Sequence, residues 1–231
     1  MATVETARGP IAAESLGRTL MHEHVFIVHA EIDQNFDVGF DEDHEVANAV
    51  ARMNELKALG IDTIVDLTVI GLGRYVPRLL RVAEQTDLNL VIATGVYTFD
   101  ETPHHHRFQS PDSMAELFVR DLTEGIHRTS VKAGILKCAT DEKGVTDGVE
   151  RVLRACARAQ VLTGAAISTH THAPTRRGLE QQRIFADEGV DLGRVVIGHS
   201  GDTIDFDYLE QLVIAGSYLG MDRFGLNWPI N

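Results

Sequence analysis

The sequence has few of the features that mark secreted, membrane-bound or nucleic-acid-binding proteins. Only two of its 231 residues are cysteines, Cys138 and Cys156, which is too few for a disulfide framework. Lysine and arginine number 21 against 34 aspartates and glutamates, a net charge of −13, and no basic cluster is denser than Arg176-Arg177. Proteins that bind phosphate backbones or anionic membranes usually carry the opposite charge balance. We therefore expect no nucleic-acid partner and no membrane partner.

Long apolar segments are also scarce. No run approaches the roughly 18 residues of a transmembrane helix, and the segment from Met1 to Arg8 lacks the apolar core of a secretory signal. With 44% hydrophobic and 24% charged residues, the composition is that of an ordinary globular domain. These features favour a cytoplasmic protein, and they do not indicate a particular function.

Short apolar segments alternate with amphipathic ones along the whole chain. Stripes of apolar residues at helical spacing end at Gly60, Gly164 and Gly216, and Pro77 is typical of a helix start. The segments predicted as strands are rich in valine, isoleucine and leucine, as parallel strands buried on both faces are. They are Arg18–Phe26, Ile61–Thr68, Leu88–Thr94, Ala133–Lys137, Ala165–Thr171, Arg194–Gly198 and Ser217–Met221.

Seven β-then-α units in series predict an α/β fold of (β/α)8 TIM-barrel type, with only about seven βα units present. A doubly wound open sheet is the alternative. A complete barrel has eight strands and typically about 250 residues. We therefore expect a single (β/α) barrel domain over residues 1–231 that lacks the eighth strand and the C-terminal helices. Two long inserts, Val28–Asp43 and Thr98–Pro111, follow strands, where loops build the active face of a barrel.

Two histidines flank Glu23 at the end of the first predicted strand. Residues i and i+2 of a strand point to the same side, so His22 and His24 can hold one metal ion together. On a helix the same spacing would point them to nearly opposite sides. Such a pair in an apolar stretch is more often ordinary polar packing than a metal site, and the metal interpretation depends on further candidates along the chain.

Three further candidates lie at later strand ends. Lys137 ends the fourth predicted strand, His170 lies near the end of the fifth, and His199 follows the sixth. The C-terminal ends of barrel strands are where such enzymes place catalysis. An ammonium group is a poor ligand and costly to bury, but a neutral lysine amine can add carbon dioxide and become a carbamate that bridges two ions. The alternative is an ion pair between Lys137 and a carboxylate such as Asp66.

These residues lie in motifs that resemble the phosphotriesterase family of the amidohydrolase superfamily, and within it the lactonase-like branch. The resemblance runs from about Gly9 to about Gly225. The motifs are Thr19-Leu20-Met21-His22-Glu23-His24, Ala133-Gly134-Ile135-Leu136-Lys137, Ser168-Thr169-His170-Thr171 and Ile197-Gly198-His199-Ser200.

The resemblance implies a (β/α)8 barrel with two divalent metal ions. His22 and His24 would bind the more buried ion, His170 and His199 the more exposed one, and Lys137, carboxylated by carbon dioxide, would bridge both. Histidine and carboxylate-type ligands suit zinc, with cobalt, manganese and iron as alternatives. Two such ions share a hydroxide and polarise the substrate oxygen.

Two positions bear on the substrate. Tyr97 resembles the lactonase-branch tyrosine over the metal pair, and its alternative is a half-buried aromatic at a strand end. Arg223, in Met221-Asp222-Arg223-Phe224-Gly225, matches the lactonase branch, whereas phosphotriesterases proper tend to have histidine there; its alternative is a surface arginine. The resemblance thus favours a quorum-quenching type of lactonase that acts on acyl-homoserine or related lactones, with promiscuous phosphotriesterase activity. It also implies a possible homodimer, because homodimers are common among such proteins.

The sequence departs from the family at its end. The family takes a further aspartate from the eighth strand, as a ligand and proton shuttle, and no residue here matches it; the pattern drifts from about Asn227. We therefore keep two alternatives: a phosphotriesterase proper, and a catalytically impaired fragment that binds metal poorly. Among other histidines, we expect His104–His106 in an exposed insert and His172 in a hydrogen bond at the pocket rim.

Overall fold

The structure is a computed structural model that describes residues 2–224. The drift from the family pattern predicted from Asn227 onward lies outside the described residues. Contacts divide the chain into two compact units: Met1–Thr94 with Asp121–Gly134 forms unit 1, and Gly95–Arg120 with Ile135–Asn231 forms unit 2. The single barrel domain over residues 1–231 stays a prediction.

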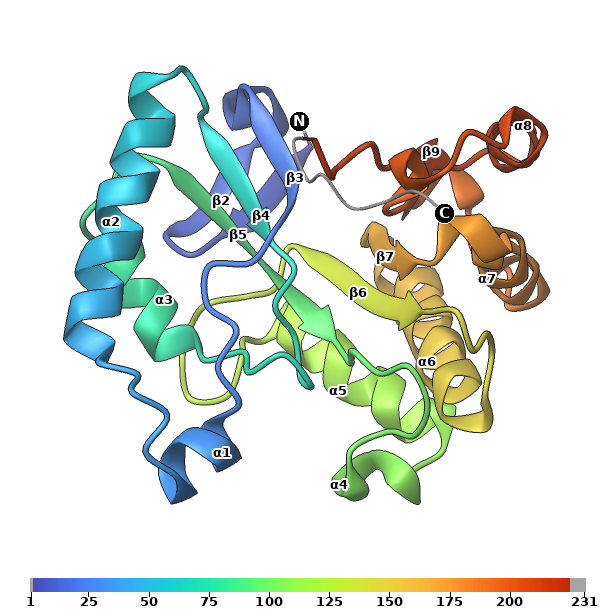
Figure 1. The fold of residues 1–231 in the computed structure, drawn as a ribbon, viewed down its shortest axis with the longest axis horizontal. Helices are drawn as coiled ribbons and strands as arrows, with labels where there is room; N and C mark the ends of the chain where they lie inside the picture. Colours follow the sequence, from blue (N-terminus) through green and yellow to red (C-terminus); the bar gives the residue numbers. More distant parts are fainter. Residues whose placement is uncertain (1, 225–231) are drawn as a thin grey trace. The chain divides into compact units, whose positions relative to one another are not determined.

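Unit 1 combines a hairpin with a parallel sheet. Its hairpin pairs β1 (Thr3–Thr6) with β2 (Gly9–Ala12) in antiparallel fashion. Its sheet pairs β3 (Thr19–Glu23), β4 (Thr63–Asp66) and β5 (Asn89–Gly95) in parallel, in chain order. The connecting elements are the 3-10 turn η1 (Ala13–Leu16) and the helices α1 (Ala30–Asn35), α2 (Glu42–Ala58) and α3 (Val76–Ala83). In Figure 1, α2 and α3 lie on one side of these strands.

The helices of unit 1 begin and end where their sequences provide caps. The Asp41 carboxylate accepts a hydrogen bond from the His44 backbone N–H at the start of α2, which satisfies a donor that has no partner within the helix. Val46 and Met53 point from α2 into the core of the unit, at the predicted helical spacing. Pro77 lies in the first turn of α3, as predicted.

Unit 2 continues the same β-then-α series. Its parallel sheet is formed by β6 (Ile135–Thr140), β7 (Ile167–Thr171), β8 (Val195–Ile197) and β9 (Tyr218–Leu219), paired in this order. Its helices are α4 (His104–Arg107), α5 (Pro111–Thr123, whose last turn belongs to unit 1), α6 (Asp147–Thr163), α7 (Arg177–Asp187) and α8 (Phe206–Ile214). Three 3-10 turns, η2 (Ala173–Thr175), η3 (Leu192–Arg194) and η4 (Ser200–Asp202), complete it.

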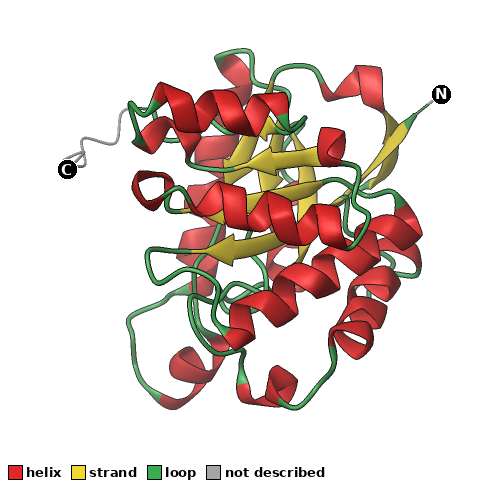
Figure 2. Cartoon of the chain, turned by 90° about the vertical axis from the view of Figure 1, so that its right-hand side faces the viewer, coloured by secondary structure: helices red, strands yellow, loops and turns green. Residues whose placement is uncertain are grey.

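Every residue of β6 and β7 is buried, because helices cover these strands. In Figure 1, α6 and α7 lie beside β6 and β7, and the view in Figure 2 shows red helices in front of the yellow strands. Helix α6 begins at Thr146, whose hydroxyl accepts from the Val149 N–H, and ends at Gly164 in a left-handed conformation, as predicted. These covered strands carry the candidate site at their C-terminal ends.

All seven predicted strands are present in the described part of the chain, each inside or overlapping its predicted range. The hairpin β1–β2 and the helices α1, α4, α5 and α7 were not predicted. Within residues 2–224, no helix has both the length and the apolar character that crossing a membrane requires.

Candidate functional site

Unit 1 places His22 and His24 side by side at the end of β3. Their ring centroids are 5.7 Å apart and the ring planes are inclined by 66°. The Nδ1 atom of His24 lies 3.0 Å from the hydroxyl oxygen of Thr68, in the segment that follows β4. This contact orients the imidazole ring of His24. Their assignment as metal ligands stays a prediction.

Lys137 lies in the middle of β6 and is fully buried, with 0% of the residue exposed. Burial lowers the pKa of its ammonium group to about 7, and the nearby Arg223 charge adds to this lowering against the opposing influence of Cys138 and Asp222. A substantial fraction of Lys137 is therefore a neutral amine near neutral pH. A neutral amine is the form that reacts with carbon dioxide, so this environment fits the predicted carbamate.

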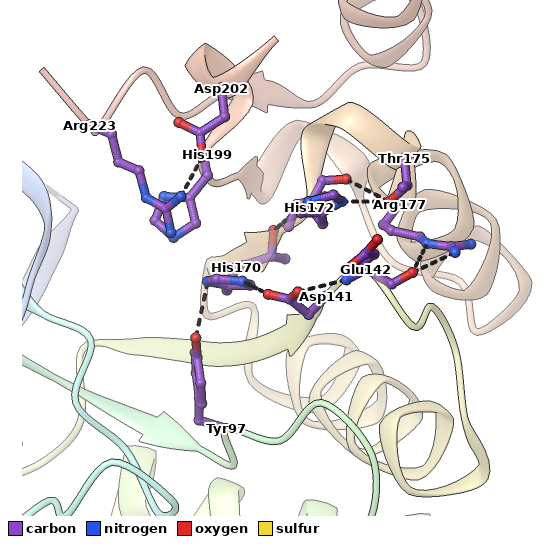
Figure 3. Close-up of polar contacts among 12 residues, drawn as sticks. Tyr97, Asp141, Glu142, His170, His172, Thr175, Arg177, His199, Asp202 and Arg223 are labelled. Atoms are coloured by element: carbon purple, nitrogen blue, oxygen red, sulfur yellow. Dashed lines mark hydrogen bonds and ion pairs between the residues drawn. The ribbon is translucent and has the colours of Figure 1, made fainter. Parts of the chain in front are cut away.

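His170 lies at the C-terminal end of β7 between a carboxylate and a phenol (Figure 3). Its Nε2 atom lies 2.6 Å from Asp141 Oδ2, and its Nδ1 atom lies 3.2 Å from the Tyr97 hydroxyl oxygen. Burial lowers the pKa of His170 to about 4, despite the opposing effect of Asp141. The imidazole is therefore neutral at neutral pH, the form that binds metals.

His199 directly follows β8 in a left-handed backbone conformation, with φ of 57°. Its backbone N–H donates to Asp222 Oδ1 over 3.0 Å, and its Nδ1 lies 2.8 Å from the same oxygen. The ring centroids of His170 and His199 are 4.6 Å apart. Asp222 therefore fixes both the backbone and the ring of His199.

Arg223 and Tyr97 border the same cluster in unit 2. The Arg223 guanidinium forms an ion pair with Asp202 from η4, so Arg223 is a partly buried, fixed cation. Burial raises the pKa of the Tyr97 phenol well above its ordinary value, and the Asp141 charge adds to this. Tyr97 therefore keeps its proton. Phe99 lies against both rings, 4.9 Å from the centroid of Tyr97 and 5.0 Å from that of His170.

Three residues of this cluster were not singled out from the sequence. Asp222 stands beside Arg223 in a motif already quoted, so its position could have been noticed. Asp141 lies one residue past the end of β6, four positions after Lys137, which is the only signal that the sequence offers. Phe99 lies in the predicted insert after β5 and carries no signal of its own.

The donor chemistry fits divalent cations. Metal-binding histidines usually have their second ring nitrogen held by a carboxylate, a carbonyl or water. His170 has Asp141 in this role and His199 has Asp222. Lys137 adds an amine that burial favours in its neutral form. Unit 2 thus brings together Lys137, His170 and His199, and unit 1 brings together the other two predicted ligands.

The remaining histidine predictions have mixed outcomes. His172 bonds the Thr175 hydroxyl through Nδ1 over 2.8 Å, consistent with a rim residue. The prediction that His104–His106 all lie exposed is wrong for His106, which is buried. The three histidines lie in the short helix α4, where successive side chains point in different directions, so one of them can face the interior while the others face outward. His106 there contacts Gln109 Oε1 at 3.3 Å.

Comparison with known proteins decides the family. A model described as "Phosphotriesterase family" matches residues 2–230. The chain belongs to the phosphotriesterase family. It is 62% identical to the "Phosphotriesterase homology protein" of Mycobacterium tuberculosis over 98% of this chain and 72% of that protein. It is 42% identical to the "Aryldialkylphosphatase" of Saccharolobus solfataricus over 94% of this chain and 69% of that protein. This confirms the family resemblance that the four motifs carry.

The fold class is confirmed as well. The solved structure of the phosphotriesterase from Mycobacterium tuberculosis superimposes with a TM-score of 0.95, at 62% identity, over 98% of this chain and 72% of that one. A more distant relative, 27% identical over 96% of this chain and 73% of its own length, is an "N-acetyltaurine hydrolase" of Dictyostelium discoideum. Relatives of this chain are thus named for hydrolysis of different bonds, and the chain is a hydrolase by family.

Proposed function

We propose that this protein is a metal-dependent lactonase that hydrolyses acyl-homoserine or related lactones, with phosphotriester hydrolysis as a weaker activity. The observation that carries the proposal is the cluster formed by the middle of β6, the C-terminal end of β7 and the residue after β8. Lys137, which is fully buried and has a lowered pKa, belongs to this cluster together with His170 and His199, and a carboxylate contacts one ring nitrogen of each histidine.

The proposed ligands are His22, His24, His170, His199 and a carboxylated Lys137, for two divalent ions with zinc first. When bound, such ions would lower the pKa of a water molecule and polarise the ester or phosphoryl oxygen. The chain's own contribution is to present neutral donors. Burial keeps the imidazole of His170 unprotonated and the amine of Lys137 reactive toward carbon dioxide. Both properties are in place in the folded chain before any ligand arrives.

Tyr97 and Arg223 are the residues we assign to substrate. The Tyr97 phenol keeps its proton and stands beside His170, so it would donate a hydrogen bond to an oxygen of a substrate placed there. Arg223 is held by Asp202 and lies near enough to Lys137 and Tyr97 to lower the pKa of both groups. It would place positive charge where a lactone carbonyl gains negative charge.

A comparison of substrates tests the proposal. Under one metal condition, kcat/KM is measured on an acyl-homoserine lactone and on paraoxon. A lactone is planar at the reacting carbon and a phosphotriester is tetrahedral, so one pocket shape favours one of them. We expect the lactone to be preferred. A large excess for paraoxon would instead support a phosphotriesterase proper, the alternative that the name of the Saccharolobus relative favours.

Metal analysis separates both enzymes from a catalytically impaired chain. The purified protein is stripped with chelator and reloaded with zinc, cobalt, manganese or iron(II), with and without bicarbonate. A site that contains a carbamate should fill further when carbon dioxide is available. A chain that holds no metal under any of these conditions would contradict the proposed function. The homodimer stays a prediction, which sedimentation of the same samples tests.

A further inference from the structure

Asp141 holds two different N–H groups with its two carboxylate oxygens. Oδ2 lies 2.6 Å from Nε2 of His170, and Oδ1 accepts from the backbone N–H of Glu142 over 2.7 Å (Figure 3). The carboxylate is therefore fixed to its own turn on one side and to the His170 ring on the other. An ionised carboxylate only accepts hydrogen bonds, so the Nε2 atom that faces it must carry a hydrogen.

The turn that carries Asp141 is itself anchored. Arg177, at the start of α7, donates from Nε and Nη2 to the Glu142 carbonyl oxygen over 3.2 and 2.7 Å. Its Nη1 also bonds the Glu180 carboxylate over 2.7 Å. Gly144 has φ of +82°, and a Cβ there would lie 2.8 Å from the Arg177 guanidinium. The guanidinium thus packs directly against the turn. The turn restricts the movement of Asp141, so the carboxylate holds a fixed position beside the His170 ring.

The other side of the His170 ring gives independent support. The Tyr97 hydroxyl oxygen lies 3.2 Å from Nδ1, so a phenol O–H there can donate to a lone pair on Nδ1. The backbone carbonyl of His170 accepts from Gln181 Nε2 over 2.9 Å, which fixes the residue from behind. The acceptor beside Nε2 is Asp141, and the donor beside Nδ1 is Tyr97. Both contacts require the ring hydrogen to be on Nε2 and the lone pair on Nδ1.

We propose that Asp141 is a positioning residue that locks His170 in the tautomer with hydrogen on Nε2 and the lone pair on Nδ1. The inference rests on the proposed function in one respect, that Nδ1 is the atom offered to the metal. The alternative tautomer would place a lone pair against the carboxylate and is excluded by charge repulsion. Arg177 contributes by holding the turn.

The test uses three variants. In Asp141→Asn the amide has one oxygen for two N–H groups, so it either releases Glu142 or turns its NH2 toward Nε2 and reverses the tautomer. Asp141→Ala removes both contacts. Glu142→Gln is the matched control, because it removes a neighbouring, exposed carboxylate and keeps the backbone carbonyl that Arg177 holds. Melting by circular dichroism verifies that each variant is folded.

Long-range ¹H–¹⁵N spectra of metal-free protein with labelled histidine report the tautomer, and His170→Gln assigns the His170 signals. We expect a pyrrole-type Nε2 and a pyridine-type Nδ1 in the unmodified chain and in Glu142→Gln. We expect altered or averaged shifts in Asp141→Asn or Asp141→Ala. A pyrrole-type Nδ1 in the unmodified chain, or identical shifts in all folded variants, would overturn the proposal.

Zinc affinity, measured by chelator competition, separates this inference from the proposed function. Loss of a carboxylate that orients a ligand typically weakens metal binding by about 10–100-fold, and we expect this for both Asp141 variants but not for the control. If the unmodified chain binds no zinc while its ring spectrum responds to Asp141, the proposed function fails and the positioning role stands. If zinc binds equally to all variants and the spectra agree, the positioning role fails alone.

Discussion

Replacing Asp66 by asparagine should stabilise the protein above pH 6 and have little effect near pH 4. Asp66 ends β4, is fully buried, and its Oδ2 atom has no hydrogen-bond partner among the described residues. Burial raises the pKa of this carboxyl from 3.8 to about 6, although hydrogen bonds from Thr68 partly oppose the rise. The folded protein therefore prefers the protonated acid, and ionisation at higher pH opposes folding.

The sign and size follow from linkage. A folded-state pKa above the unfolded value means that stability falls as pH rises from about 4 to about 6, and the loss is complete above that window. A difference of about two pKa units corresponds to about 3 kcal/mol. Asparagine does not ionise, and its oxygen can keep the bond from the Thr68 N–H. The free energy of unfolding of Asp66→Asn relative to the unmodified chain should therefore rise by up to about 3 kcal/mol between pH 4 and pH 8.

The assay is urea unfolding followed by circular dichroism at intervals from pH 4 to pH 8, with chelator present so that metal does not contribute. Asp87→Asn is the control, because Asp87 is an exposed carboxylate in the same unit. A stability difference for Asp66→Asn that stays constant over the whole pH range would refute the reasoning. So would an equal pH dependence in the control.

Three further predictions concern the cluster in unit 2. Gly95→Ala should destabilise the protein by about 4 kcal/mol or more, seen in urea unfolding, because Gly95 has φ of +143° and a Cβ there would lie 1.8 Å from the Lys137 carbonyl oxygen. Tyr97→Phe should cost only about 1 kcal/mol of stability but lower kcat/KM on lactones, since it removes the hydroxyl beside His170; an unchanged kcat/KM would contradict the assignment. Lys137→Met should raise the melting temperature of metal-free protein, because it removes a buried amine. The same substitution should abolish metal uptake, measured by elemental analysis, because it removes a proposed ligand.

The strands could be predicted from the sequence because burial on both faces leaves a continuous apolar signal. Several helices could not be predicted in this way. Helix α7 was not predicted, and the residues that it buries include Gln181 and Gln182. The Gln182 amide donates to the Leu212 carbonyl oxygen over 2.9 Å, and Gln181 contacts Thr171 over 3.1 Å. A helix that packs through satisfied amides has no apolar stripe at the spacing of 3.6 residues, so periodicity cannot detect it.

The candidate ligands could be predicted because histidine and lysine are conspicuous in apolar strands. The residues that orient them could not. Asp141 lies in the stretch Asp141-Glu142-Lys143-Gly144, which has the composition of any exposed turn. Its role depends on Arg177, 36 positions later in the chain, which holds that turn in place. Contacts between segments this far apart are set by packing and leave no local pattern.

The strand register adds a second condition that the sequence leaves open. Lys137 pairs with Ser168, and Ala139 pairs with His170, across β6 and β7. Residues two apart on a strand share a face, so this face carries two large side chains, each beside a small one. A shift of the register by one residue would place Lys137 and His170 on opposite faces. Ser168 and Ala139 are therefore as necessary to the cluster as its ligands, because they leave the room in which a lysine and an imidazole can face the same space.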